Sequence, residues 1–219
     1  QFEMMNVFST VSSNAILQSR DKLRSFQHLS KAGVDMPKTV FTNYSRDIEN
    51  VIARVGGTPV VIKLLEGTQG IGVVLAESKN AAESVLEAFN GLEARALVQE
   101  YIAEAKGADL RVFIVDGQVV GAMKRQGKKG EFRSNLHRGG SYTYRKLSDE
   151  EIELAIKAAK KLKLPICGVD ILQSNRGPLV MEINSTPGLE GIEEVSNKNI
   201  AKAIITYIEQ GKGIKNISA

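Results

Sequence analysis

The chain has 219 residues, of which 42% are hydrophobic and 25% are charged, and its formal net charge is +4. This length and composition predict one or two globular domains with a buried core. No apolar run approaches the roughly 18 residues that a membrane helix needs, and no signal peptide is recognisable, so neither a membrane protein nor a membrane partner is expected.

The single cysteine and the first residue add two expectations. Cys167 cannot form an internal disulfide, which favours a reducing, cytoplasmic environment. The chain begins with Gln1 rather than Met, which indicates a fragment that lacks an N-terminal part.

The positive charge is concentrated in one segment. Residues 124–146 contain eight basic side chains and one acidic side chain, so this segment carries +7 and the remainder carries −3. Such an asymmetry predicts a local site for an anionic ligand rather than a uniformly basic surface.

The first half of the chain alternates helix and strand patterns. Residues 1–19 are polar and weakly patterned, and we expect an edge segment or the remnant of a connection. Helices are predicted from about residue 21 to Gly33, from a cap at Ser45 to residue 57, and after a cap formed by Asn80 and Glu83. The predicted strands span residues 39–41, 59–65, 71–76 and 96–101.

The second half begins with two strands, residues 110–115 and 118–124, which the dipeptide Asp116-Gly117 joins as a hairpin. Ser148 and Glu151 have the spacing of a capping box for the next helix. A second hairpin and a helix over about residues 199–209 follow. Because helices alternate with strands while the hairpins are antiparallel, we expect mixed rather than wholly parallel sheets.

The second hairpin carries the most informative chemistry. Residues 168–172 and 179–184 are apolar strands joined by turn-forming residues, so Asp170 should lie close to Glu182 across the pair. Simple alternation would place Val180, Glu182 and Asn184 on one face of the second strand. Two carboxylates and an amide oxygen, without His or Cys nearby, suit Mg²⁺ or Mn²⁺ with a nucleotide phosphate completing the coordination. The alternative is a polar strand end with solvated carboxylates.

A glycine-rich loop, residues 66–72, joins two strands. Its glycines would let backbone N–H groups approach phosphates, although neither the P-loop nor the dinucleotide spacing is present and a plain β-turn also fits. Lys63, just before the loop, lies in an apolar strand where an unpaired ammonium group is costly to bury. It is well placed to meet phosphates, or else it extends along a sheet edge. Residues 98–102 end a strand and open a connector whose backbone could bond an adenine edge.

Together these features resemble the ATP-grasp ligases, and within them the RimK-like members. The resemblance covers nearly all of the chain from about Arg20, and its most specific parts are residues 66–73, 132–140 and 184–191. It implies an α+β ATP-grasp fold, in which two α/β subdomains with mixed, largely antiparallel sheets grip ATP between them. The implied division is a remnant of a connection to a missing domain at 1–19, a smaller subdomain with the glycine-rich loop at 20–101, and a C-terminal subdomain with the metal site and a basic substrate loop at 102–219.

The resemblance also implies roles for individual residues. The nucleotide would contact Lys22, Lys63, Gly67, Gln69, Gly70, Glu100, Tyr101, Asp109, Arg133, Ser134 and Asn135, with Lys22 and Lys63 on phosphates, Glu100 and Tyr101 on adenine and Asp109 on the ribose. Two Mg²⁺ or Mn²⁺ ions would be held by Asp170, Glu182 and Asn184. The catalytic residues would be Arg111, Arg125, Arg133 and Asn135, with Arg111 and Arg125 facing the transferring phosphoryl group and the acyl phosphate.

The activity that the resemblance implies is ATP-dependent ligation through an acyl phosphate. L-glutamate would be added to the C-terminal glutamate of a protein or peptide, as with ribosomal protein S6, or short poly-glutamate would be made, and the enzyme would be a homo-oligomer. An alternative within the class is another acidic acceptor or a carrier protein. A different alternative is a nucleic-acid-binding module, because Tyr142 and Tyr144 alternate with basic residues, although an acidic substrate is the better use of this charge.

Overall fold

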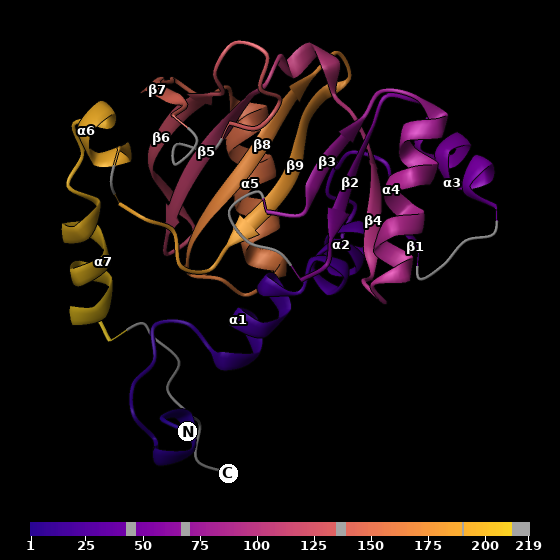
Figure 1. Cartoon of the computed structure of the whole chain (residues 1–219). Helices are drawn as coiled ribbons and strands as arrows, with labels where there is room; N and C mark the ends of the chain where they lie inside the picture. Colours follow the sequence, from indigo (N-terminus) through magenta and orange to yellow (C-terminus); the bar gives the residue numbers. More distant parts are fainter. Residues whose placement is uncertain (43–46, 67–70, 135–138, 190, 212–219) are drawn as a thin grey trace.

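The computed structural model describes residues 1–42, 47–66, 71–134, 139–189 and 191–211. Two sheets stand side by side, with helices on their outer faces (Figure 1). Every strand pairing in the described part of the chain is antiparallel, so both sheets are antiparallel, whereas the sequence pattern predicts mixed ones. The predicted α+β class with two sheet units is confirmed.

The smaller sheet has the order β1-β4-β2-β3. Its strands are β1 (Thr39–Thr42), β2 (Val60–Leu64), β3 (Val73–Ala76) and β4 (Ala96–Glu100). Helices α3 (Ile48–Val55) and α4 (Lys79–Gly91) pack on one face, against Val60, Ile62 and Val98. Because side chains alternate along a strand, Val61 and Lys63 point to the opposite face, where they line a cavity.

The caps of α3 and α4 differ from the predicted ones. Asp47 caps α3 by accepting a hydrogen bond from the N–H of Asn50, and Ser78 caps α4 by accepting one from the N–H of Ala81. The predicted cap Ser45 lies outside the described residues, and Asn80 is already inside α4. Both observed caps place a short oxygen-bearing side chain directly before the first helical turn.

The larger sheet has the order β7-β6-β5-β8-β9. Its strands are β5 (Ala108–Val115), β6 (Gln118–Gln126), β7 (Ser141–Tyr144), β8 (Ile166–Ser174) and β9 (Gly177–Asn184). The predicted turn between β5 and β6 is confirmed, since Asp116 and Gly117 both adopt positive φ, at 52° and 73°. The edge strand β7 was not predicted.

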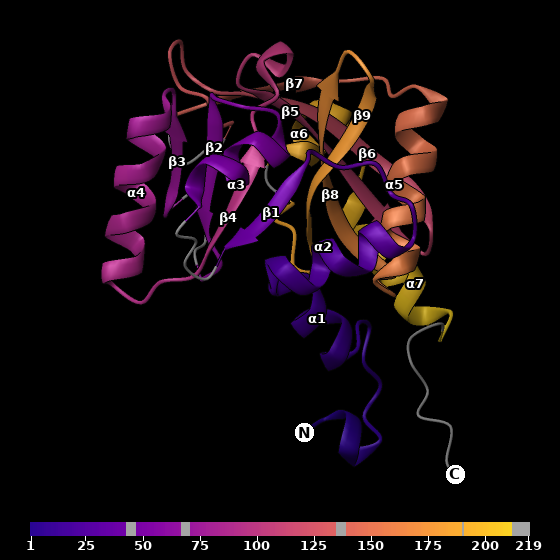
Figure 2. The ribbon, with the colours of Figure 1, turned by 90° about the vertical axis from the view of Figure 1, so that its right-hand side faces the viewer.

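The two faces of the larger sheet have different helices (Figure 2). Helix α5 (Asp149–Lys161), which begins with the predicted capping box, covers Leu110, Val112 and Ile114 on one face. Helices α6 (Ile192–Ser196) and α7 (Ile200–Glu209) pack on the other face, over Phe113 and Met123. On this second face, alternation along β5 continues from Phe113 to Arg111 and Asp109, so the apolar bed of α6 and α7 adjoins a polar region.

The N-terminal region is more structured than expected. A short 3₁₀ turn (Glu3–Met5) precedes α1 (Ser13–Arg20), which is a helix rather than an edge segment and is capped by Ser12, followed by α2 (Lys22–Lys31). Ala15 and Leu29 join the core beneath the larger sheet together with α5. No helix in the described ranges is long and apolar enough to cross a membrane.

A β-bulge in β9 corrects the predicted alternation. Asp170 lies opposite Glu182, as expected, but Ile171 lies opposite Val180, so Met181 has no partner in β8. The extra residue reverses the parity, and Val180 therefore packs in the core with Ile183 instead of sharing a face with Glu182. The bulge keeps Val180 buried while Met181 and Glu182 both line the cavity.

Candidate active site

A cavity of about 510 Å³ lies where the smaller sheet meets the polar face of the larger sheet. All but one of the predicted site residues that the structure describes line it: Lys22, Lys63, Glu100, Tyr101, Asp109, Arg111, Arg125, Arg133, Ser134, Glu182 and Asn184. Asp170 is the exception, because it is completely buried in the floor below. The predicted residues Gly67, Gln69, Gly70 and Asn135 lie outside the described residues.

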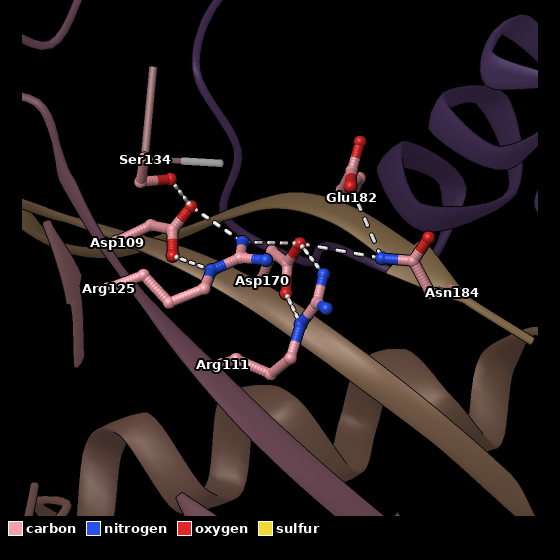
Figure 3. A network of polar contacts seen from close by, with 7 residues as sticks. All are labelled: Asp109, Arg111, Arg125, Ser134, Asp170, Glu182 and Asn184. Atoms are coloured by element: carbon pink, nitrogen blue, oxygen red, sulfur yellow. Dashed lines mark hydrogen bonds and ion pairs between the residues drawn. The ribbon is translucent and has the colours of Figure 1, made fainter. Parts of the chain in front are cut away.

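The floor of the cavity is a chain of charged side chains (Figure 3). Arg125 holds Asp109 through two hydrogen bonds of 2.7 Å, from Nε to Oδ1 and from Nη2 to Oδ2. Arg111 holds Asp170 in the same way, at 2.8 Å from Nε and 2.6 Å from Nη2, and Arg125 Nη2 also reaches Asp170 at 2.8 Å. Strand register explains these pairs, since Asp109 lies opposite Arg125 and Arg111 lies opposite Asp170.

This floor is nearly dry. The side chains of Asp109, Arg125 and Asp170 are at most 7% exposed, and that of Arg111 is 16% exposed. Burial alone would raise the pKa of Asp170, but the guanidinium groups of Arg111 and Arg125 hold it well below its usual range. Two arginines therefore neutralise two aspartates, and the cluster as a whole contributes little net charge to the cavity.

Asp109 is already engaged on both oxygens. Besides Arg125, the hydroxyl of Ser134 donates a hydrogen bond to its Oδ2. A ribose contact by Asp109, which the resemblance implies, would require this cluster to open. In the observed arrangement Asp109 connects the segment around Ser134 to Arg125, and through Arg125 to Asp170.

The opposite wall of the cavity carries positive charge of a different kind. Lys63 comes from β2, and no hydrogen bond or ion pair of its ammonium group is found among the residues that the structure covers. Burial lowers the pKa of Lys63, and the nearby carboxylate of Glu182 acts against this shift. Lys22 also reaches the cavity and donates to the carbonyl oxygen of Leu65 at 3.0 Å, which holds α2 beside the end of β2.

Glu182 is the acidic residue that faces these lysines. The Glu182 side chain is exposed at the cavity, but the protein atoms crowded around it still raise the pKa of Glu182, and the neighbouring Asp170 raises it further. Asn184 Nδ2 donates to Glu182 Oε1 at 3.2 Å and approaches Asp170 Oδ2 at 3.4 Å. The structure thus brings together the three residues of the predicted metal site.

The donor set fits a hard divalent cation. Asp170, Glu182 and Asn184 offer carboxylate and amide oxygens at the cavity floor, and a cation would relieve the charge repulsion that raises the pKa of Glu182. Presenting the amide oxygen of Asn184 needs only a rotation about χ2, because its nitrogen is the atom now facing the carboxylates. In the described ranges no group of three His, Cys, Asp or Glu side chains could hold a metal, so a site here would depend on the amide oxygen of Asn184 beside the two carboxylates.

The segment before Ser134 closes one side of the cavity. Arg133 pairs with Glu131 through Nε and Nη2, at 2.9 and 2.8 Å, and its Nη1 donates to the carbonyl of Val73 at 3.3 Å. The segment crosses so close to the backbone at Gly107 and Gly127 that a side chain at either position would collide with carbonyl oxygens of Glu131 or Arg133. The predicted nucleotide ligand Arg133 therefore connects the larger sheet with β3.

Sequence reasoning missed several residues of the site. Directly after Asn184, the cavity is also lined by Ser185, Thr186, Pro187 and Gly188, to which the sequence patterns assign no role. The hydroxyl of Ser185 is buried without a hydrogen-bond partner among the described atoms. Their position directly after the strand that carries the predicted metal ligands is the signal that could have identified them. Glu131, which occupies the fork of Arg133, could not be recognised from spacing alone.

Comparison with known proteins agrees with this geometry. The family model described as a RimK-like ATP-grasp domain matches residues 19–208. Probable alpha-L-glutamate ligase 2 of Shewanella frigidimarina is 60% identical over 218 residues, covering 99% of this chain and 73% of the relative. The probable alpha-L-glutamate ligase of Saccharophagus degradans is 62% identical over 209 residues, covering 95% of this chain and 69% of the relative.

Solved structures show the same fold at lower identity. The ATP-grasp ligase PsnB, complexed with minimal precursor, Mg and ADP, has a TM-score of 0.75 at 24% identity, over 96% of this chain and 65% of PsnB. D-alanine–D-alanine ligase from Bacillus anthracis has a TM-score of 0.76 at 18% identity, over 97% of this chain and 76% of that one. The chain thus spans just under two thirds of PsnB and about seven tenths of the curated relatives.

Proposed function

Because this chain belongs to the RimK-like ATP-grasp family of enzymes, we propose that it is an ATP-dependent ligase that joins L-glutamate to the C-terminal carboxylate of an acidic peptide or protein. The observation that carries the proposal is the cavity between the two sheets, which gathers two lysines, four arginines and a cluster of hard oxygen donors. The names of the relatives support glutamate as the amino acid that is added.

The nucleotide would lie between the sheets, with its phosphates toward Lys22 and Lys63. An ammonium group held in a poorly solvated wall without a partner of its own gains most from an incoming anion, and Lys63 meets this description. The adenine would contact the backbone at Glu100 and Tyr101, where β4 ends and the connector to the larger sheet begins. In this arrangement residues 20–101 and 102–219 would act as the two gripping subdomains.

Asp170, Glu182 and Asn184 would hold Mg²⁺ or Mn²⁺. When bound, such an ion neutralises phosphate charge and orients the transferring phosphoryl group. Glu182 would supply the negative charge for this purpose, because the charge of Asp170 is already balanced by arginine. Asp170 would then serve both as a ligand and as the anchor that fixes Arg111 and Arg125.

The reaction would need no nucleophilic side chain. A carboxylate oxygen of the acceptor attacks the γ-phosphorus, and the bond to ADP breaks. The glutamate nitrogen then attacks the acyl carbon of the resulting acyl phosphate, and phosphate leaves as the amine loses its proton. Arg111 and Arg125 line the cavity and are fixed by Asp170 and Asp109, so the N–H groups that do not bond these carboxylates would orient the reacting groups and stabilise developing negative charge.

The acceptor would be recognised by the basic segment at 124–146, whose surplus positive charge suits several carboxylates. A C-terminus like that of ribosomal protein S6, ending in glutamate, has this chemistry, and repeated addition would give short poly-glutamate. Burial raises the pKa of the Cys167 thiol to about 12, so this cysteine would stay an inert thiol in the cytoplasm. We also propose that the enzyme is a homo-oligomer.

The direct test is product formation by the full chain. With Mg-ATP, L-glutamate and a peptide ending in two glutamates, we expect ADP release coupled to a peptide mass increase of one glutamate residue. A matched peptide ending in two alanines should give little product. ATP hydrolysis without ligation, or equal use of both peptides, would contradict the proposal, and product with an unrelated acidic carrier would replace the acceptor that we name.

A further inference from the structure

An ion pair outside the arginine–aspartate cluster joins the two sheets at the end of the cavity where the adenine would lie. Glu100 is the last residue of β4, and Arg176 lies in the turn between β8 and β9 of the larger sheet. Arg176 Nη1 donates to Glu100 Oε1 at 2.8 Å, and Nη2 donates to Oε2 at 2.5 Å. Both carboxylate oxygens are therefore held by one planar fork.

Further hydrogen bonds converge on the same place. The N–H of Lys38 donates to Glu100 Oε2 at 3.0 Å, while the N–H of Glu100 donates to the carbonyl of Lys38 at 2.8 Å. On the other side of Tyr101 and Ile102, Glu104 Oε1 accepts from the N–H of Asn175 at 3.0 Å. The connector between the sheets is thus held at both ends by the β8–β9 turn, and Ile102 between them is 4% exposed.

We propose that Arg176 is a positioning residue for the nucleotide, which fixes the connector at residues 100–102 so that its backbone presents one geometry to the adenine. The inference rests on the proposed function, because it assumes that a nucleotide occupies the cavity. It gives the carboxylate of Glu100 a role in holding the connector and leaves contact with the base to the backbone.

The geometry separates this pair from an ordinary surface ion pair. Lys79 and Glu49, which join α4 to α3 on the outer side of the smaller sheet, make a single contact of 2.8 Å with side chains 46% and 76% exposed. The Arg176–Glu100 pair has two contacts and links the two sheets. Arg176 is 46% exposed, as Lys79 is, but the carboxylate of Glu100 lines the cavity and is only 20% exposed. A bidentate pair with a sheltered carboxylate restricts orientation more than a flexible exposed one.

The test compares Arg176→Ala with the wild-type full chain. Removing the fork should weaken binding of Mg-AMPPNP, measured by calorimetry, roughly 3- to 5-fold, the size of effect expected for a partly exposed bidentate pair. In turnover assays the KM for ATP should rise by a similar factor, with kcat and the KM for glutamate unchanged. Arg176→Lys should recover part of the loss, and Lys79→Ala is the matched control that should leave nucleotide binding unchanged.

A double-mutant cycle tests whether Arg176 acts through Glu100. In a Glu100→Gln background, Arg176→Ala should have little further effect on nucleotide affinity, since the partner is already weakened. Additive losses would overturn the inference, as would a lower melting temperature with unchanged affinity for Mg-AMPPNP. Absence of nucleotide binding by the wild type would overturn the proposed function together with this inference, whereas equal binding by wild type and Arg176→Ala would overturn the inference alone.

Discussion

The two walls of the cavity balance their charges in opposite ways. On the larger sheet, Asp109 and Asp170 are buried with Arg111 and Arg125 as direct partners, in bonds of 2.6 to 2.8 Å. On the smaller sheet, Lys63 has a lowered pKa, and Glu182, across the cavity in β9, has a raised one. The charges of the arginine–aspartate cluster are therefore neutralised within the fold. The charges of Lys63 and Glu182 would be stabilised by a bound ligand that supplies an anion for the lysine and a cation for the glutamate.

This difference predicts that the two groups respond differently to mutation. Residues of the arginine–aspartate cluster should affect the free energy of unfolding first, because breaking a buried pair leaves an uncompensated charge. Lys63 and Glu182 should affect ligand binding and turnover first, because the folded protein gains little from their charges.

The largest effect is expected for Asp170→Asn. The substitution leaves Arg111 without its carboxylate partner and Arg125 with Asp109 alone, so we expect a loss of about 3–5 kcal/mol in the free energy of unfolding. Urea denaturation measures this loss. A change below about 1 kcal/mol would show that Asp170 is not needed to hold the arginines, since that is the size of an exposed pair.

The pH dependence of the same variant gives a second check. A carboxyl group whose folded-state pKa is lowered contributes stability above its unfolded pKa and loses it as the pH falls through the folded value. The pKa of Asp170 is held well below its ordinary 3.8, so the stability difference between wild type and Asp170→Asn should persist below pH 3.8. A difference that disappears already near pH 5 would point to another group.

The next effect concerns Glu182→Gln, which keeps the shape and removes one anionic oxygen. We expect turnover to fall by at least about 10- to 100-fold, because changes to residues that only hydrogen-bond a metal ligand already cost that much. The thermal stability without Mg²⁺ should be unchanged or higher, because the raised pKa means that the fold disfavours this charge. Normal activity at limiting Mg²⁺ would show that Glu182 is only a strand-end carboxylate.

Part of this contrast could be predicted from sequence alone. The turn residues between β8 and β9 predicted the hairpin, and the hairpin placed Asp170 opposite Glu182. The turn at Asp116-Gly117 and the capping box at Ser148 were predicted for the same reason, since both depend on residues close in the chain. Local chemistry therefore identified the elements that carry the site.

The remaining features depend on contacts between distant segments. Arg111 and Asp170 are 59 positions apart, and their pairing follows from strand order, which no local pattern shows. The bulge at Met181 could not be predicted, because one unpaired residue reverses the alternation without changing the composition. Strand β7 is a polar edge strand, Ser-Tyr-Thr-Tyr, and lacks the apolar alternation that indicates a half-buried strand.

A smaller effect is expected for Lys63→Met, which removes the ammonium group and keeps an unbranched side chain. Nucleotide affinity should fall about 10-fold, as for the loss of a charge-assisted hydrogen bond to phosphate. Since the folded-state pKa of Lys63 is lowered, the unfolded chain binds more protons below pH 10.5, and wild-type stability should rise with pH toward that value. In urea titrations at pH 8 and 10, the free energy of unfolding of the variant should therefore increase less with pH than that of the wild type. An identical pH dependence would mean that Lys63 is well solvated.

The smallest effect is expected for Ser134→Ala, which tests whether Ser134 belongs to the arginine–aspartate cluster or only borders it. The hydroxyl of Ser134 donates to Asp109, and Asp109 keeps both bonds from Arg125 when the hydroxyl is removed, so no buried charge is left unpaired. We therefore expect a loss of about 1 kcal/mol in the free energy of unfolding, the usual value for one hydrogen bond. Ser141→Ala, an exposed position in β7, is the matched control and should change stability less.

A loss as large as that of Asp170→Asn would show that Ser134 is an integral part of the charged cluster rather than its border. No loss would mean that the segment around Ser134 is held by Arg133 alone, through Glu131 and the carbonyl of Val73.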